Sequence, residues 1–193
     1  MLRLYLLRHA KSSWSDPSLH DFDRPLNKRG RKDAPKLARA MQERAYHPDR
    51  ILCSSAQRTK ETLAGIIPGL SGDVSLSLLD ALYEGNAPDY LSLLRLHAKQ
   101  SRNLMLVGHN SGLQDTAIRL AGRGDVDLLL ALQDKYPTGA LAVLDFNTDD
   151  WNMVMPGSGK LIDFIKPRDL THQVEGSDEA HLVENPAPTF FRR

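Results

Sequence analysis

An arginine and a histidine follow the first apolar run of the chain. Residues 4–7 have the composition of a short buried strand, and Arg8 and His9 come directly after it. A strand that leaves the core and becomes polar at the surface is the simplest interpretation of this pair. The alternative is chemical. A guanidinium matches phosphate oxygens and an unprotonated imidazole is a nucleophile, so the pair could form a phosphate site with a covalent step.

Two later strand candidates end in residues of the same types. The stretch "DRILCSS" leads to Arg58, and the stretch "NLMLVGH" ends in His109. Two guanidinium groups, two imidazoles and the N-terminus of a helix supply more donors than a carboxylate can use, which favours a phosphoryl group. Crowded cations disfavour an imidazolium, so at least one of the two histidines can stay neutral at physiological pH.

The elements that must position these residues alternate along the chain. Strand patterns cover residues 2–7, 49–55, 74–79 and 103–109. Helical patterns cover residues 28–43, 56–67, 88–99 and 112–122, with Asn27 placed to cap the first of them and Pro68 placed to stop the second. We predict an α/β fold, a three-layer α/β/α sandwich with a mostly parallel central sheet. In such sheets ligands collect at the carboxyl ends of the strands, where Arg8, Arg58 and His109 would converge.

The last part of the chain is expected to complete the sheet. The stretches "GALAVLDF" and "WNMVM" predict a hairpin, and "GKLIDFIKP" predicts a final strand. We expect one domain over residues 1–170. Residues 171–193 are polar and lack periodicity, so we expect a tail that is disordered or packed over the domain.

Composition limits the classes of protein that this chain can belong to. Of its 193 residues, 41% are hydrophobic and 25% charged, as in an ordinary soluble protein, and a net charge of +1 argues against a general nucleic-acid surface. No apolar run is long enough to span a bilayer, and the first residues do not resemble a signal peptide. Cys53 is the only cysteine, which excludes an internal disulfide and fits a cytoplasmic location.

Five ordered motifs carry a resemblance to a known family. In the order "LLRHAKSSW", "LNKRG", "SSAQRTKET", "LYEG" and "LVGHNSG", the chain resembles the histidine phosphatase superfamily, which includes the phosphoglycerate mutases. The short length and the wording of the first and last motifs are most similar to the SixA-type phosphohistidine phosphatases. The resemblance covers roughly residues 2–146 and implies a phosphoglycerate mutase-like fold.

The resemblance implies a role for each matching residue. His9 would be the nucleophile that forms a transient phosphohistidine. Arg8, Arg58 and His109 would hold the phosphoryl oxygens, and no metal or other cofactor is expected because the arginines supply the positive charge. Glu84 of "LYEG" stands where mutase-like relatives carry a glutamate proton donor, although the wording differs from theirs. A solvated loop carboxylate is the alternative interpretation of Glu84. The family's usual Arg-His-Gly has Ala10 here, the smallest substitute for glycine.

Several neighbouring residues have two interpretations. Lys11, Ser12 and Trp14 either rim the pocket and contact substrate or belong to a surface loop. Ser55 and Thr59 could add hydroxyl donors but more commonly serve a turn and a helix start. A solvated helix start explains Arg24, Lys28 and Arg29, and an attraction for an acidic partner protein is the alternative. The remaining histidines lack metal-ligand spacing, and "GSGK" lacks the first glycine and the final Ser or Thr of a nucleotide loop.

The sequence therefore predicts a phosphatase that works through a phosphohistidine on His9. The expected substrate is phosphohistidine in a phosphotransfer protein, because the loops are short, for instance between Leu79 and Ala87, and an open pocket admits a protein side chain. A small phosphate ester is the alternative substrate. A pseudoenzyme that binds phosphorylated partners and a protein that passes the phosphoryl group onward are competing functions. Mutase activity suits a closed site and is not expected.

Overall fold

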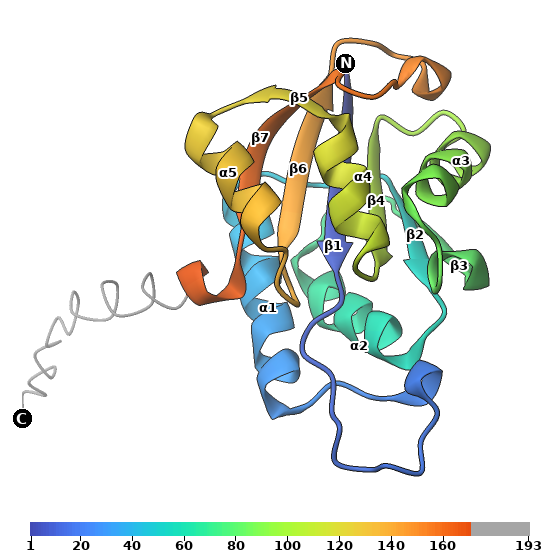
Figure 1. Cartoon of the computed structure of the whole chain (residues 1–193), viewed down its shortest axis with the longest axis vertical. Coiled ribbons are helices and arrows are strands. Elements are labelled where there is room, and N and C mark those ends of the chain that lie inside the picture. The colour runs from blue at the N-terminus through green and yellow to red at the C-terminus, as the bar shows by residue number, and fades with distance from the viewer. Residues whose placement is uncertain (171–193) are drawn as a thin grey trace, which may run out of the picture.

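The structure is a computed structural model that describes residues 1–170, and the predicted tail lies outside the described residues (Figure 1). Seven strands form one sheet: β1 (Leu2–Arg8), β2 (Arg50–Ser54), β3 (Ser75–Leu79), β4 (Asn103–Gly108), β5 (Ala121–Gly124), β6 (Leu141–Phe146) and β7 (Gly159–Ile165). The helices are α1 (Lys28–Glu43), α2 (Gln57–Ile66), α3 (Ala87–His97), α4 (Gly112–Leu120) and α5 (Val126–Asp134).

The sheet is mostly parallel, as predicted. Its strand order is β3-β2-β4-β1-β6-β7-β5. Strands β1 to β4 run parallel to one another, β5 runs parallel to β7, and β6 is antiparallel to both of its neighbours. The carboxyl ends of β1, β2 and β4 therefore meet at one edge of the sheet, which is where ligands bind in such folds.

Helices cover both faces of the sheet and complete the three layers (Figure 1). Side chains of β1 alternate between two apolar cores: Leu4 and Leu6 pack with residues of α3, α4 and α5, whereas Tyr5 and Leu7 pack with residues of α1 and α2. This alternation follows from the two-residue period of a strand. The predicted α/β/α sandwich is confirmed.

Helix starts follow local capping rules. The side chain of Asn27 accepts a hydrogen bond from the amide of Gly30 at 2.9 Å, which confirms the predicted cap of α1. Asn86 and Asp89 form a reciprocal capping box at the start of α3. Gly30 also lets α1 approach the chain that follows His9, because a Cβ at this position would lie 2.3 Å from the carbonyl oxygen of Lys11.

Three details of the prediction are wrong. Residues 151–153 form a 3-10 helix instead of a hairpin strand, because the Trp151 indole donates to the carbonyl of Ser101 at 2.7 Å and Asp150 caps the turn. Strand β6 pairs with β7 instead.

Helix α4 ends at Leu120, and residues 121–124 form the edge strand β5, where Gly122 closely approaches the backbone of Gly157. Helix α5 has no counterpart among the predicted elements. No helix of the described part is both long and apolar enough to cross a membrane.

Candidate active site

Four residues predicted from three stretches of sequence meet at the carboxyl edge of the sheet: Arg8, His9, Arg58 and His109. The His9 amide donates to the carbonyl of Gly108 at 3.0 Å, which fixes the end of β1 beside the end of β4. The centroids of the His9 and His109 rings are 5.1 Å apart. Burial is the main cause that lowers the pKa values of His9 and His109, and the positive charges of Arg58 and Arg8 add to this effect.

His9 presents a neutral imidazole with one free nitrogen. Its ring is buried, with 7% exposed, and its Nδ1 lies 2.8 Å from the carbonyl oxygen of Ala10. A carbonyl can only accept, so Nδ1 carries the proton and donates, and Nε2 keeps its lone pair. Burial lowers the pKa of His9 to about 3, and the positive charges of Arg58, Arg8 and Arg24 add to this effect. His9 is therefore unprotonated and nucleophilic at neutral pH.

Helix α2 holds the segment that carries His9. The Ala10 amide donates to Thr62 Oγ1 at 2.9 Å, and the Thr62 hydroxyl donates to the carbonyl of Arg58 at 2.6 Å. Ala10 and Thr62 are both buried. One hydroxyl group thus joins the residue after His9 to the turn that presents Arg58.

His109 is held at both its backbone and its ring. Its amide donates to the Tyr90 hydroxyl at 3.1 Å, and its Nε2 lies 2.9 Å from Ser54 Oγ. Burial is the main cause that lowers the pKa of His109 to about 3, and the neighbouring His9 and Arg58 add to this effect. Gly108 is required before it, because a Cβ there would lie 2.2 Å from the Tyr90 hydroxyl oxygen.

Two buried nitrogens of the cluster have no hydrogen-bond partner within residues 1–170. They are Nε of Arg8 and Nδ1 of His109. Arg8 Nη1 donates to the carbonyl of Tyr136 at 2.6 Å, whereas its Nε is buried without a partner. When the Ser54 hydroxyl donates to His109 Nε2, the proton of that ring lies on Nδ1. Unpartnered donors in a buried cationic site are suited to the oxygens of an incoming oxyanion.

Asp21 belongs to the site and was not predicted from the sequence. It lies in the 3-10 helix η1 (Asp21–Asp23) of the loop between β1 and α1. Its Oδ2 accepts from Arg58 Nη2 at 2.9 Å and from the Tyr83 hydroxyl at 2.7 Å, and its Oδ1 accepts from Arg24 Nη1 at 2.6 Å. Burial opposes ionisation of Asp21, but the hydrogen bonds and the charge of Arg58 outweigh it and lower the pKa of Asp21 to about 2. A carboxylate in a polar loop has no sequence signal that separates it from its neighbours.

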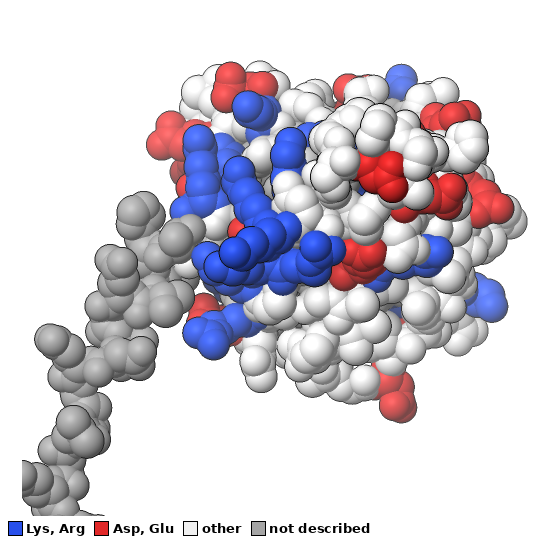
Figure 2. Space-filling view, turned by 90° about the horizontal axis from the view of Figure 1, so that it is seen from below, with Lys and Arg blue, Asp and Glu red and all other residues white. Residues whose placement is uncertain are grey.

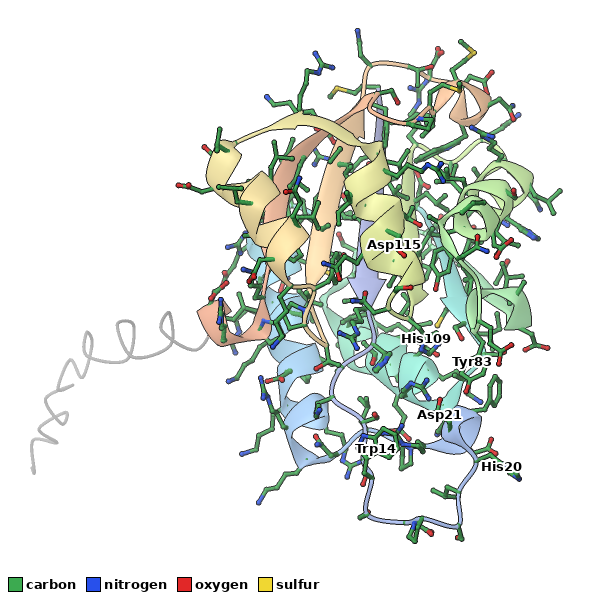
Figure 3. All side chains as sticks on the ribbon, viewed as in Figure 1. Trp14, His20, Asp21, Tyr83, His109 and Asp115 are labelled. Carbon is green, nitrogen blue, oxygen red and sulfur yellow. The ribbon has the colours of Figure 1, made fainter. Side chains whose placement is uncertain are left out.

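Tyr83 is the second site residue that was not predicted from the sequence. Its ring packs edge-on against His109, with centroids 5.3 Å apart, and the Arg58 guanidinium lies 5.6 Å from the ring centroid. Figure 3 shows Asp21, Tyr83 and His109 grouped below the sheet, with Trp14 and His20 farther out on the same side.

Glu84 follows Tyr83 in the chain but is exposed, and it makes no hydrogen bond or ion pair with any described residue. Its role as proton donor stays a prediction, as do the substrate contacts of Lys11 and Ser12. Lys11 is exposed, whereas Ser12 is buried and its hydroxyl accepts from Arg24 Nη2 at 2.8 Å. The connection from β3 to α3 is short, as expected.

The remaining candidates have structural partners. Arg24 is buried and lies against the ring of Trp14, 3.1 Å from its centroid, so it is not part of a solvated helix start. The Thr59 hydroxyl donates to the carbonyl of Ser54 at 2.7 Å, and the Ser55 hydroxyl donates to Asp80. Within residues 1–170, no three His, Cys, Asp or Glu side chains are grouped so that they could hold a metal ion.

Comparisons with known proteins agree with this arrangement. The sequence model of the histidine phosphatase superfamily (branch 1) matches residues 4–104. An uncharacterised chloroplast protein of Arabidopsis thaliana is 36% identical over 178 residues, which cover 86% of this chain and 78% of the relative. A candidate phosphohistidine phosphatase SixA from Agrobacterium tumefaciens is 36% identical and has a TM-score of 0.72. The match covers 86% of this chain and 98% of the SixA chain. A protein histidine phosphatase SixA complexed with tungstate shares the fold, with a TM-score of 0.69, 18% identity and coverage of 88% and 99%.

Proposed function

This chain belongs to the histidine phosphatase superfamily and is similar to its SixA-type members, and we propose that it hydrolyses phosphohistidine in a phosphotransfer protein. The observation that carries the proposal is the state of His9. Its Nδ1 is committed to the carbonyl of Ala10, its Nε2 is free, and the charges of Arg8 and Arg58 act on it. A neutral nucleophile inside a cationic pocket suits attack on an anionic phosphoryl group.

In the first step, the lone pair of His9 Nε2 forms a bond to phosphorus. The bond between phosphorus and the substrate imidazole breaks, and its electron pair stays on the leaving nitrogen. Arg8, Arg58 and His109 donate to the phosphoryl oxygens and stabilise the charge that develops on them. The Nδ1–H of His9 continues to donate to Ala10, and this hydrogen bond strengthens as the ring becomes cationic.

In the second step, water attacks phosphorus and the bond to His9 Nε2 breaks. The electron pair of that bond returns to Nε2, the product is inorganic phosphate, and the proton of the water passes to solvent. The substrate imidazole that leaves in the first step is basic enough to accept a proton from solvent. Phosphohistidine therefore requires a positioned acid less than a phosphate ester does, which is consistent with the exposed position of Glu84.

Two features support a protein substrate. The connection from β3 to α3 is short, and nearly half of the Asp21 side chain, 48%, is exposed beside Arg58. The fold is shared with a protein histidine phosphatase that binds tungstate, an oxyanion with the shape of phosphate. The positive charges of Arg8 and Arg58 support metal-independent chemistry here.

The test is phosphate release from a phosphotransfer domain that carries phosphohistidine, measured with EDTA present for the wild type and for His9→Ala. Rapid release by the wild type and none by His9→Ala is the expected result. Hydrolysis of small phosphate esters without release from the phosphotransfer domain would move the substrate to metabolites. Binding of phosphate without turnover of either substrate would favour a pseudoenzyme.

A further inference from the structure

A basic pocket adjoins the phosphoryl site on the side of β6 and β7. It has a volume of about 370 Å³, and among residues 1–170 Asp134 is the one carboxylate in its lining. Six lining residues are cationic: Arg8, Lys11, Arg29, Lys135, Lys166 and Arg168. Figure 2 shows Lys and Arg side chains gathered in a band across this face of the molecule.

Arg8 connects the pocket to the phosphoryl site. Its Nη1 donates to the carbonyl of Tyr136, in the connection between α5 and β6 that also supplies Lys135 to the lining. Lys11 enters the pocket from the segment just after His9, and Arg29 enters from the first turn of α1. The last wall comes from the end of β7 and the 3-10 helix η5 (Pro167–Leu170). A ligand in this pocket would therefore lie next to a group bound by Arg8.

The positive charge of the pocket is largely uncompensated. Lys11, Lys135 and Lys166 have no carboxylate within ion-pair distance in the described part of the chain. Arg29 pairs with Asp33 at 3.3 Å and Arg168 with Asp169 at 3.5 Å, but both guanidinium side chains are mostly exposed, at 66% and 74%. Exposed pairs of this kind hold their partners weakly. Because the whole chain carries a net charge of only +1, this concentration of charge is local.

We propose that this pocket docks an acidic segment of the phosphorylated substrate protein, next to its phosphorylated side chain. The proposal rests on the function proposed above and adds a determinant of substrate choice. Long exposed cations that come from several elements match carboxylates spread along a protein surface. Complementary charge of this kind raises association rates and selects partners.

The test compares two phosphohistidine peptides of equal length. One carries Asp and Glu on both sides of the phosphohistidine, and the other carries Asn and Gln at those positions. Phosphoimidazole serves as a substrate without any flanking group. The pocket variant is Lys135→Glu with Arg168→Glu, two exposed positions. The matched control is Lys99→Glu with Arg102→Glu, which makes the same change of charge just before β4, at the opposite edge of the sheet.

The wild type should hydrolyse the acidic peptide with a kcat/KM about tenfold higher than the neutral peptide, and added salt should reduce this ratio. The pocket variant should lose the preference, the control variant should keep it, and phosphoimidazole hydrolysis should be equal in all three proteins. Equal use of the two peptides by the wild type would overturn the proposal, as would the same loss of preference in the control variant.

The proposed function and the docking proposal can fail separately. If neither peptide nor phosphoimidazole is hydrolysed, the proposed function fails. Fluorescence anisotropy with the unphosphorylated peptides then decides docking: tighter binding of the acidic peptide that the pocket variant loses supports it, and equal binding overturns it. Pyrophosphate that binds the wild type but not the pocket variant, with equal binding of both peptides, would assign the pocket to a small polyanion and also overturn the proposal.

Discussion

At the scale of single residues, burial and charge keep both site histidines neutral. Each histidine is 7% exposed and lies among arginines, and burial is the main cause that lowers both pKa values to about 3. His9 is therefore already unprotonated at neutral pH, as the proposed attack on phosphorus requires. Substitutions can therefore act most selectively on the orientation of the arginines in the site.

Asp21 is the residue whose substitution should show this. We expect Asp21→Asn to lower kcat/KM by about 10- to 100-fold, because charge-assisted hydrogen bonds to Arg58 and Arg24 are replaced by weaker ones. The substitution also removes a titratable group. The measurement is the rate of phosphate release as a function of pH. A positioning role predicts a lower rate and an unchanged free energy of unfolding.

Asp23→Asn is the matched control, since Asp23 lies in the same 3-10 helix and its side chain makes no hydrogen bond or ion pair with residues 1–170. It should keep the wild-type rate. An Asp21→Asn enzyme that binds inorganic phosphate more tightly and turns over at the wild-type rate would show that Asp21 only repels the anion.

At the scale of elements, α2 holds the end of β1 through a single hydroxyl group. Thr62→Val removes the partner of the Ala10 amide, and an unpartnered buried donor costs about 1–3 kcal/mol. We expect the free energy of unfolding in urea to fall by that amount. We also expect kcat/KM to fall, because Ala10 supplies the carbonyl that orients His9.

Thr116→Val provides the comparison. Thr116 is as fully buried as Thr62, but its hydroxyl donates only to the carbonyl of Gly112, one turn earlier in its own helix. Its loss leaves no donor of another element unpartnered. A loss of stability and activity at Thr116 equal to that at Thr62 would contradict the assigned role of the Thr62 hydroxyl.

At the scale of the whole molecule, the two neutral histidines make stability depend on pH. Their pKa values are about 3 in the folded protein and about 6.5 in the unfolded chain. Between these values the unfolded chain binds more protons, so acid favours unfolding. The stabilisation is fully present above pH 6.5 and is lost as the pH falls toward 3. Each histidine contributes a slope of up to about 1.4 kcal/mol per pH unit within this window.

Urea unfolding at pH 7.5, 6.5 and 5.5 measures this effect. The free energy of unfolding of the wild type should fall as the pH is lowered. His9→Asn should reduce the slope, and the double variant His9→Asn with His109→Asn should reduce it further. Equal slopes for the three proteins would contradict the assignment of the pH dependence to these two rings.

Much of the fold follows from patterns within short windows of the chain. Apolar runs, their spacing and the cap at Asn27 are sufficient to predict most strands and helices, the mixed α/β class and the convergence of Arg8, His9, Arg58 and His109. The reason is that parallel strands place their carboxyl ends at one edge of the sheet, so residues that follow these strands share a site. The short strand β5 could not be predicted in this way, because its residues form a strand only by pairing with β7.

The contacts between distant segments belong to the tertiary structure. Asp21 and Tyr83 enter the site only because their loops meet over Arg58, 37 and 25 residues away along the chain. The basic pocket likewise collects side chains from the segment after β1, from α1, from the α5–β6 connection and from the end of β7. Hydrogen bonding and charge act across space and leave no periodic trace in the sequence. The convergence of the two histidines and two arginines is therefore predictable from the sequence, whereas their orientation and the basic pocket depend on how the loops pack.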